Sequence, residues 1–228
     1  MPVLLRFFPL AFLDHSEKNR ALVDPNLLLL IPKYLPSYPV RSVTFNQTEI
    51  TVKILLSEKE LNEGVEKLAV QINETYQGKP LTIVGVLTGS VILMADLIRK
   101  LEMPLRVGVV QTSSYEGTQR GALTINSEMM LDISGRDVLL IDDIFDTGNT
   151  LEEVTQLMQE LGPTSLKSAV LLLKTGRQEV DWKPEFIAFE IPDEFVVGYG
   201  LDYNDEYRNL PHLAILEPAD IQGSASET

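Results

Sequence analysis

VLLIDDIFDTGNT, residues 138–150, is the stretch on which the fold of this chain depends. Its apolar half, Val138 to Ile141, follows the turn residue Gly135 and predicts a buried strand of a parallel sheet. The apolar run stops at two adjacent carboxylates, Asp142 and Asp143. We therefore expect the strand to end there and the chemistry to begin.

The polar half of the stretch predicts a turn that opens a helix. Helical apolar spacing continues to Gly162-Pro163 through Leu151, Val154, Leu157, Met158 and Leu161. In open α/β sheets, ligands bind beyond the carboxyl ends of strands, and the amides at the start of the following helix can hold a phosphate. Strand, acidic turn and helix together predict an α/β fold with a ligand site at this junction.

The carboxylates of this turn restrict the ligand. Asp142, Asp143 and Asp146 would repel a phosphate unless they face hydroxyls, a metal or a protonated base. A sugar phosphate satisfies both parts of the turn, because its phosphate suits the amides of the helix and its diol suits the carboxylates. No Walker motif supports a nucleoside triphosphate. A plain helix cap is the alternative, but three acids beside the Thr-Gly-x-Thr of residues 147–150 favour a binding site.

At this point the stretch resembles the phosphoribosyl pyrophosphate signature of type I phosphoribosyltransferases. A second stretch, Ile191 to Pro211 (IPDEFVVGYGLDYNDEYRNLP), is similar to the purine- and metal-binding region of the hypoxanthine-guanine branch of that family. The resemblance extends from about Ile50 onward. It implies the type I phosphoribosyltransferase fold, in which helices flank a central, mainly parallel sheet and segments near the N- and C-termini form a small hood.

The family pattern implies transfer of a 5-phosphoribosyl group from phosphoribosyl pyrophosphate to N9 of a 6-oxopurine, with Mg²⁺ as cofactor. Asp146 is then the catalytic residue, which holds a purine proton, and Lys174 is the donor to the purine O6. The implied substrate-binding residues are Thr88, Gly89, Ser114, Tyr115, Asp142, Asp143, Ile144, Asp146, Thr147, Gly148, Asn149, Thr150, Lys174, Phe195, Val196 and Arg208. The implied metal ligands are Asp142, Asp143 and Asp202.

Two other loops take their expected roles from the family. The turn Thr88-Gly89-Ser90 resembles the pyrophosphate loop, for which a cis peptide at Leu87-Thr88 is implied, although relatives often carry Lys where this chain has Thr88. Backbone amides must then contribute more to pyrophosphate binding. The pair Ser114-Tyr115 is expected to close over pyrophosphate and exclude water, while the residues alone fit a hairpin loop nearly as well.

The other elements are read from periodicity and capping. Alternation from Glu49 to Ile54 predicts a half-buried strand, and Ser57 with Glu60 forms a capping box for the helix that follows. The further strands expected are 81–87, 105–112, 123–130 as a return arm, 168–173 and 186–191, with a helix after Ser90 that extends to Leu101. Trp182, Tyr203 and His212 are expected to serve packing or structure.

Composition limits the partners. The chain has 228 residues, is 44% apolar and carries a net charge of −14, which disfavours nucleic-acid and anionic-membrane binding. The absence of Cys excludes disulfides and thiolate chemistry and is compatible with the cytoplasm. We expect a poorly ordered extension over 1–45, a phosphoribosyltransferase domain over 46–216 and a disordered tail over 217–228. A homodimer or homotetramer is the expected assembly.

Two other functions compete. A haloacid-dehalogenase-like phosphatase also has an Asp-rich loop after an apolar strand, but Asp143 and Asp146 are separated by two residues where that loop has one. The second is an RNA-binding regulator built on the phosphoribosyltransferase fold. The net charge and the presence of Lys174 and Phe195 speak against that regulator.

Overall fold

The central sheet is built around the strand that the opening stretch predicts. A computed structural model of the chain describes residues 53–113, 124–125 and 131–216. The chain divides into two units, residues 1–49 and 50–228, and all the described residues lie in the second. The extension expected over 1–45 and the tail expected over 217–228 lie outside the described residues.

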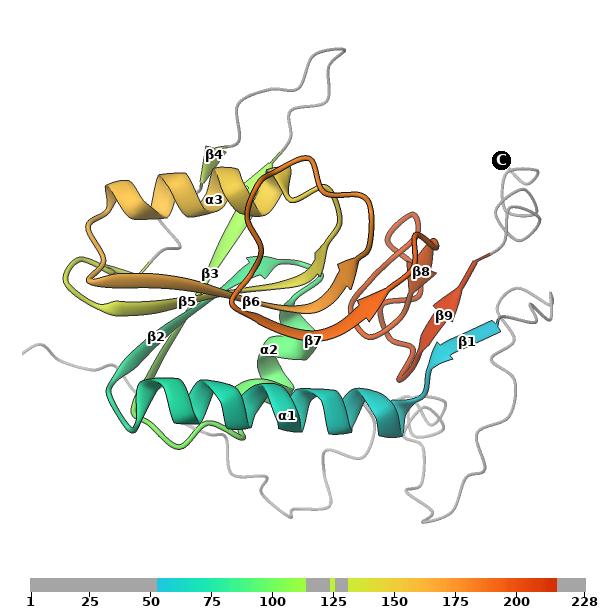
Figure 1. The fold of residues 1–228 in the computed structure, drawn as a ribbon, viewed down its shortest axis with the longest axis horizontal. Coiled ribbons are helices and arrows are strands. Elements are labelled where there is room, and N and C mark those ends of the chain that lie inside the picture. The colour runs from blue at the N-terminus through green and yellow to red at the C-terminus, as the bar shows by residue number, and fades with distance from the viewer. Residues whose placement is uncertain (1–52, 114–123, 126–130, 217–228) are drawn as a thin grey trace, which may run out of the picture. The chain divides into compact units, whose positions relative to one another are not determined.

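Nine strands and three helices are present in the described part of the chain (Figure 1). In order they are β1 (Lys53–Leu56), α1 (Glu58–Tyr76), β2 (Leu81–Leu87), α2 (Val91–Ile98), β3 (Leu105–Ser113), β4 (Thr124–Ile125), β5 (Asp137–Phe145), α3 (Asn149–Glu160), β6 (Ser165–Lys174), β7 (Phe186–Ile191), β8 (Val196–Val197) and β9 (Leu213–Ile215).

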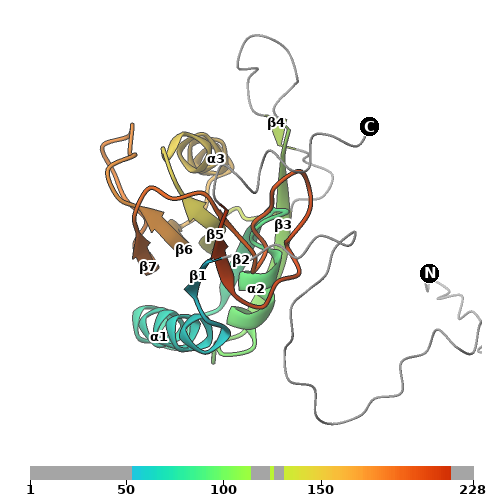
Figure 2. The same ribbon diagram turned by 90° about the vertical axis from the view of Figure 1, so that its right-hand side faces the viewer.

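The larger sheet has the strand order β4-β3-β2-β5-β6-β7. Strands β3, β2, β5, β6 and β7 are parallel, and only β4 runs antiparallel to its neighbour. Helices α1 and α2 cover one face of this sheet and α3 covers the other (Figure 2). The expected α/β fold is confirmed, because β5 lies inside a parallel sheet between two layers of helix.

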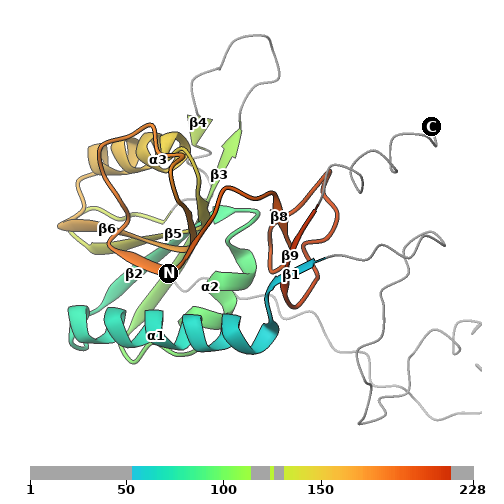
Figure 3. The ribbon, with the colours of Figure 1, turned by 45° about the vertical axis from the view of Figure 1, so that its right-hand side comes forward.

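A smaller antiparallel sheet, β1-β9-β8, forms the hood (Figure 3). It joins the first described strand to the last, with Lys53 paired to Ile215 and Ile54 to Ala214. The expected hood from both ends of the domain is therefore confirmed. The alternation expected from Glu49 to Ile54 would turn Ile54 inward, but Ile54 is 56% exposed and the strand has an irregular register between Ile54 and Leu56.

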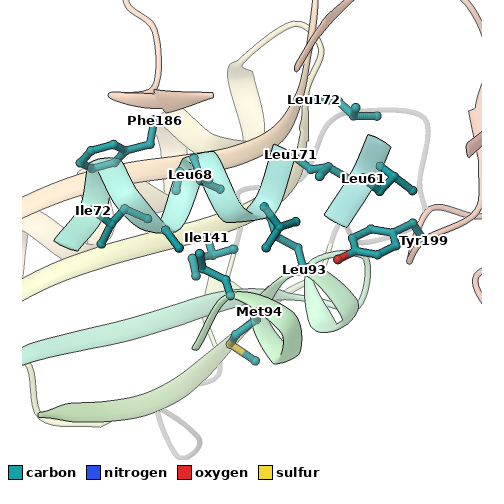
Figure 4. Packing of buried hydrophobic residues seen from close by; sticks show 14 of the residues in the cluster. Leu61, Leu68, Ile72, Leu93, Met94, Ile141, Leu171, Leu172, Phe186 and Tyr199 are labelled. Atoms are coloured by element: carbon teal, nitrogen blue, oxygen red, sulfur yellow. The ribbon is translucent and has the colours of Figure 1, made fainter. Parts of the chain in front are cut away.

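Apolar side chains pack between the sheet and α1 and α2 (Figure 4). The capping box of α1 is present, with Ser57 and Glu60 bonded to each other's backbone amides, and its predicted apolar face is buried. Helix α2 ends at Ile98 rather than at Leu101. Helix α3 buries Leu151, Val154 and Met158, whereas Leu161 lies at the C-cap and is exposed. No described helix is long and apolar enough to cross a membrane.

Candidate active site

Strand β5 extends further than one of its neighbours, and the acidic pair lies on that extension. Pairing of β5 with β2 ends at Ile141, whereas pairing with β6 continues to Phe145. The expectation that the strand ends at Asp142 is wrong, because the long-range partner β6 extends the strand through the acids. The carboxylate of Asp142 accepts from the amide of Asp143 (3.0 Å), and that of Asp143 accepts from the amide of Ile144 (2.9 Å).

Burial makes the negative charge of this pair costly. The side chain of Asp142 is buried, and burial, reinforced by repulsion from Asp143, raises its pKa well above the ordinary range. Burial also raises the pKa of Asp143, while hydrogen bonds from Asp142 and the Ile144 amide and the charge of Arg208 act in the opposite direction. Ligand hydroxyls or a cation would relieve this cost.

The turn after β5 opens α3 and borders a cavity of about 260 Å³. Gly148 caps the helix with φ of 89°, a backbone conformation that other residues rarely adopt. A Cβ at Gly148 would also overlap Val180 and lie 2.7 Å from the Phe145 ring, so the position requires glycine. The predicted residues that line the cavity are Gly89, Asp142, Asp143, Ile144, Asp146, Thr147, Gly148 and Thr150. With the amides of the helix N-terminus beside it, this cavity suits an anion.

The turn after β2 lies against the acidic pair. The peptide bond Leu87-Thr88 is cis, as the resemblance implied, and the Thr88 side chain is exposed. A Cβ at Gly89 would overlap the carboxylate of Asp143, so this glycine permits the two loops to touch. Gly200 in turn lies so close to the carbonyl oxygen of Gly89 that a Cβ there would overlap it.

A second cavity, of about 200 Å³, lies beside the first. Its predicted residues are Asp143, Ile144, Asp146, Lys174, Phe195, Val196 and Asp202. Phe195 is 43% exposed and meets Tyr203 edge to face, with ring centroids 5.7 Å apart. A half-open aromatic face next to a buried lysine suits a flat, polar heterocycle. Three residues, Asp143, Ile144 and Asp146, line both cavities.

Asp146 and Lys174 are ion-paired at the junction of the two cavities. The ammonium of Lys174 lies 3.2 Å from Oδ2 of Asp146, and 11% of the lysine side chain is exposed. This ion pair follows from the register of the sheet, because Phe145 at the end of β5 lies beside Leu173 at the end of β6. The structure thus brings the expected catalytic carboxylate and the expected purine donor together.

Asp202 and Arg208 form an ion pair beside the base cavity. Nη2 of Arg208 lies 2.8 Å from Oδ1 of Asp202, and Nη1 donates to the carbonyl oxygen of Gly200 at 2.8 Å. Among the described residues, no group of three His, Asp or Glu side chains could hold a metal by itself. Mg²⁺ typically takes one or two protein carboxylates together with substrate phosphates, so one or two of the three predicted acids suffice for a metal that arrives with its substrate.

Two of the expected substrate-binding residues lie outside the described part of the chain. A third, Asn149, contacts a residue outside the anion cavity. Ser114 and Tyr115 fall in the undescribed segment 114–123. Asn149 is the first residue of α3, and its side chain donates to Glu179 at 2.6 Å rather than lining the anion cavity.

Further polar residues, which the sequence pattern did not reveal, contact the loop after β5 or the lysine beside it. Arg177, Gln178 and Glu179 follow Lys174 closely, and Asp193 follows the end of β7. Both positions come just after the carboxyl end of a parallel strand, where ligand sites form. The same rule that marks the turns after β5 and β2 therefore also marks the polar run after β6.

Comparison with known proteins agrees with this geometry. A model of the phosphoribosyl transferase domain matches residues 51–204. The chain belongs to the phosphoribosyltransferase family. Among the relatives of this phosphoribosyltransferase is the hypoxanthine-guanine phosphoribosyltransferase of Staphylococcus aureus, which is 40% identical over 168 residues, or 73% of this chain and 94% of the relative.

Solved phosphoribosyltransferases have the same fold. A crystal structure of a hypoxanthine-guanine phosphoribosyltransferase from Bacillus anthracis, with HEPES in its active site, has a TM-score of 0.69 and 35% identity and covers 73% of this chain and 100% of its own. A mutant hypoxanthine phosphoribosyltransferase from Trypanosoma cruzi in complex with IMP has a TM-score of 0.72 and 34% identity. The match covers 77% of this chain and 96% of the Trypanosoma cruzi chain. Family membership decides against the phosphatase alternative.

Proposed function

We propose that this phosphoribosyltransferase is a hypoxanthine-guanine phosphoribosyltransferase of purine salvage. It transfers the 5-phosphoribosyl group from phosphoribosyl pyrophosphate to N9 of hypoxanthine or guanine and yields IMP or GMP with pyrophosphate. The relatives at 40% identity carry this activity in their names. The observation that carries the proposal is the pair of adjoining cavities, one suited to an anion and one to a heterocycle, which share Asp143, Ile144 and Asp146.

The donor takes the anion cavity. The amides at the start of α3, with the hydroxyls of Thr147 and Thr150, bind the 5-phosphate. Asp142 and Asp143 accept hydrogen bonds from the ribose hydroxyls, which relieves the cost of their buried charge. The backbone of the turn at Thr88 and Gly89 and the guanidinium of Arg208 take the pyrophosphate, since a planar fork of donors suits phosphate oxygens.

The purine takes the second cavity. Its ring stacks on Phe195, and backbone groups at Val196 meet the edge of the base. Lys174 donates to the oxygen at C6, which favours 6-oxopurines over 6-aminopurines. An adenine presents a donor at the same position, so the ammonium would face another donor and binding would be weak.

The chemistry takes place where the cavities meet. The bond between C1′ and the pyrophosphate oxygen breaks, the bond between C1′ and purine N9 forms, and positive charge spreads over sugar and base. Asp146 accepts or holds the purine proton at N7 as that charge develops. Asp142, Asp143 and Asp202 are the residues that would hold Mg²⁺, which when bound would supply positive charge to the pyrophosphate.

A purine panel tests the proposal. Nucleotide formation is measured with phosphoribosyl pyrophosphate and Mg²⁺ for hypoxanthine, guanine, xanthine and adenine. We expect product from the first two and little from adenine. Product from none of the four would refute the proposal, and RNA binding that weakens with salt would then favour the RNA-binding regulator. The homodimer or homotetramer and the cytoplasmic location stay predictions, which solution mass and cell fractionation would test.

A further inference from the structure

The segment after Lys174 is docked along the loop that opens α3. The amide of Glu179 donates to the carbonyl of Thr147 at 2.9 Å, and its carboxylate accepts from the side chain of Asn149 at 2.6 Å. The amide group of Gln178 reaches the carbonyl of Asp146 at 3.5 Å. Further along, the ring of Trp182 meets that of Phe145 edge to face, with centroids 5.3 Å apart. These contacts hold the backbone of the segment that carries Arg177.

Arg177 completes a closed set of four charges, which we term the charge quartet: Asp146, Lys174, Arg177 and Asp193. Nε of Arg177 lies 3.1 Å from Oδ1 of Asp146, and its Nη1 lies 3.4 Å from Oδ2 of Asp193. Lys174 lies 3.2 Å from Oδ2 of Asp146 and 3.8 Å from Oδ1 of Asp193. Each carboxylate therefore faces both cations, one through each oxygen.

Base binding would bring the purine oxygen to Lys174, on one side of the charge quartet. With one N–H directed at the purine oxygen, Lys174 divides its three donors between the base and the two carboxylates, whereas Arg177 contacts the carboxylates alone. Arg177 still holds Oδ1, and this leaves Oδ2 as the oxygen that faces the base. A carboxylate held through one oxygen presents the other in a fixed direction, which is the geometry that proton transfer requires.

We infer that Arg177 is a positioning residue, which orients the carboxylate of Asp146 for the reaction once Lys174 has turned to the purine. The inference rests on the proposed function, because it assigns Arg177 a role toward the purine proton. Arg177 lines neither substrate cavity. Its effect should therefore fall on turnover rather than on donor binding.

The test is a double-mutant cycle with Arg177→Gln, Asp146→Asn and both together. We expect Arg177→Gln to lower kcat by about 10- to 100-fold, the range that misplacement of a reacting group produces. The KM for phosphoribosyl pyrophosphate should change by no more than about 3-fold, because Gln178 and Glu179 still hold the loop. In the Asp146→Asn background, Arg177→Gln should have no further effect.

Two more variants separate positioning from loss of structure. Arg177→Lys keeps the charge but lacks the planar fork of donors, so it should recover part of the lost kcat. Lys59→Gln removes a cation of an exposed pair on α1, with Glu63 3.8 Å away, and should match the wild type. Thermal unfolding of each variant checks that it is folded.

The possible results separate the inference from the proposed function. An Arg177→Gln variant that matches Lys59→Gln overturns the inference alone. So does a loss of kcat by the same factor with and without the Asp146 carboxylate, because Arg177 would then act independently of it. A wild-type protein that forms no nucleotide overturns the proposed function and the inference with it.

Discussion

Replacement of Gly200 by Ala should damage both the stability of the fold and the binding of the donor. Gly200 has φ of 103°, a conformation that L-residues rarely adopt and that costs them on the order of 1–3 kcal/mol. A Cβ there would also overlap the carbonyl oxygen of Gly89 and lie 3.3 Å from its carbon. Forcing extra volume into a packed contact typically costs about 1–3 kcal/mol.

Gly78→Ala is the matched control. Gly78 has φ of 78° at the end of α1, but nothing lies within 4 Å of its Cβ position. It should therefore show the backbone cost without the overlap, which leaves about 1–3 kcal/mol between the two variants. For a chain of this size, that difference places the midpoint of Gly200→Ala about 2–12 °C below that of Gly78→Ala.

The functional half of the prediction follows from the position of Gly89 in the turn expected to bind pyrophosphate. Displacement of its carbonyl should raise the KM for phosphoribosyl pyrophosphate in Gly200→Ala and leave it unchanged in Gly78→Ala. Thermal unfolding by circular dichroism and initial rates at varied donor concentration measure the two effects. Equal midpoints and equal KM values would show that the two loops are not in contact.

Four other changes probe the site and the chain boundary. Asp146→Asn should lower kcat by about 10²- to 10⁴-fold with little change in donor affinity, because an amide cannot accept the purine proton; Lys174→Ala should raise the KM for hypoxanthine and weaken discrimination against adenine, as steady-state rates with both bases would show. Asp142→Asn should raise the unfolding midpoint in metal-free buffer at neutral pH, because burial raises the pKa of Asp142 and each unit of that rise costs the wild type about 1.4 kcal/mol. The stability advantage of the variant over the wild type should be absent below the ordinary Asp pKa of about 3.9. It should grow as the pH rises and be complete above the raised pKa. Deletion of residues 1–39 should leave activity per folded protein intact, as assayed beside solution mass, because every residue assigned to donor, metal or base follows Leu87.

Local sequence was enough for the elements whose partners are near in the chain. The capping box of Ser57 and Glu60 predicts the start of α1, because both halves of the bond lie within one turn. The apolar run of residues 81–87 predicts β2 to its bounds. The same reasoning ends β5 too early, because the pairing of Phe145 with Leu173 depends on a strand that begins 20 residues later.

The residues of the candidate site also divide into those that local sequence predicts and those that it does not. The acids and the helix start of residues 142–150 predict the anion cavity, because a single βα turn builds most of it. The contacts of Arg177, Gln178 and Glu179 with that turn join residues about 30 positions apart, and no periodicity in the sequence encodes them. Tyr199 donates a hydrogen bond of 2.7 Å to Asp96, which joins the segment before Arg208 to α2. This bond spans 103 positions, so the local sequence does not predict it either.

The pairing of β1 with β9 sets the time at which the hood of a newly made chain can form. Lys53 and Ile215 are partners across about 160 positions, so the hood cannot form until nearly all of the domain has left the ribosome. At about 5–20 residues per second, β1 waits on the order of ten seconds for its partner. Throughout that interval the apolar strand is an unprotected edge, open to pairing with other nascent chains. Pairing with β9 therefore ends the exposure of β1 in the same step that joins it to the hood.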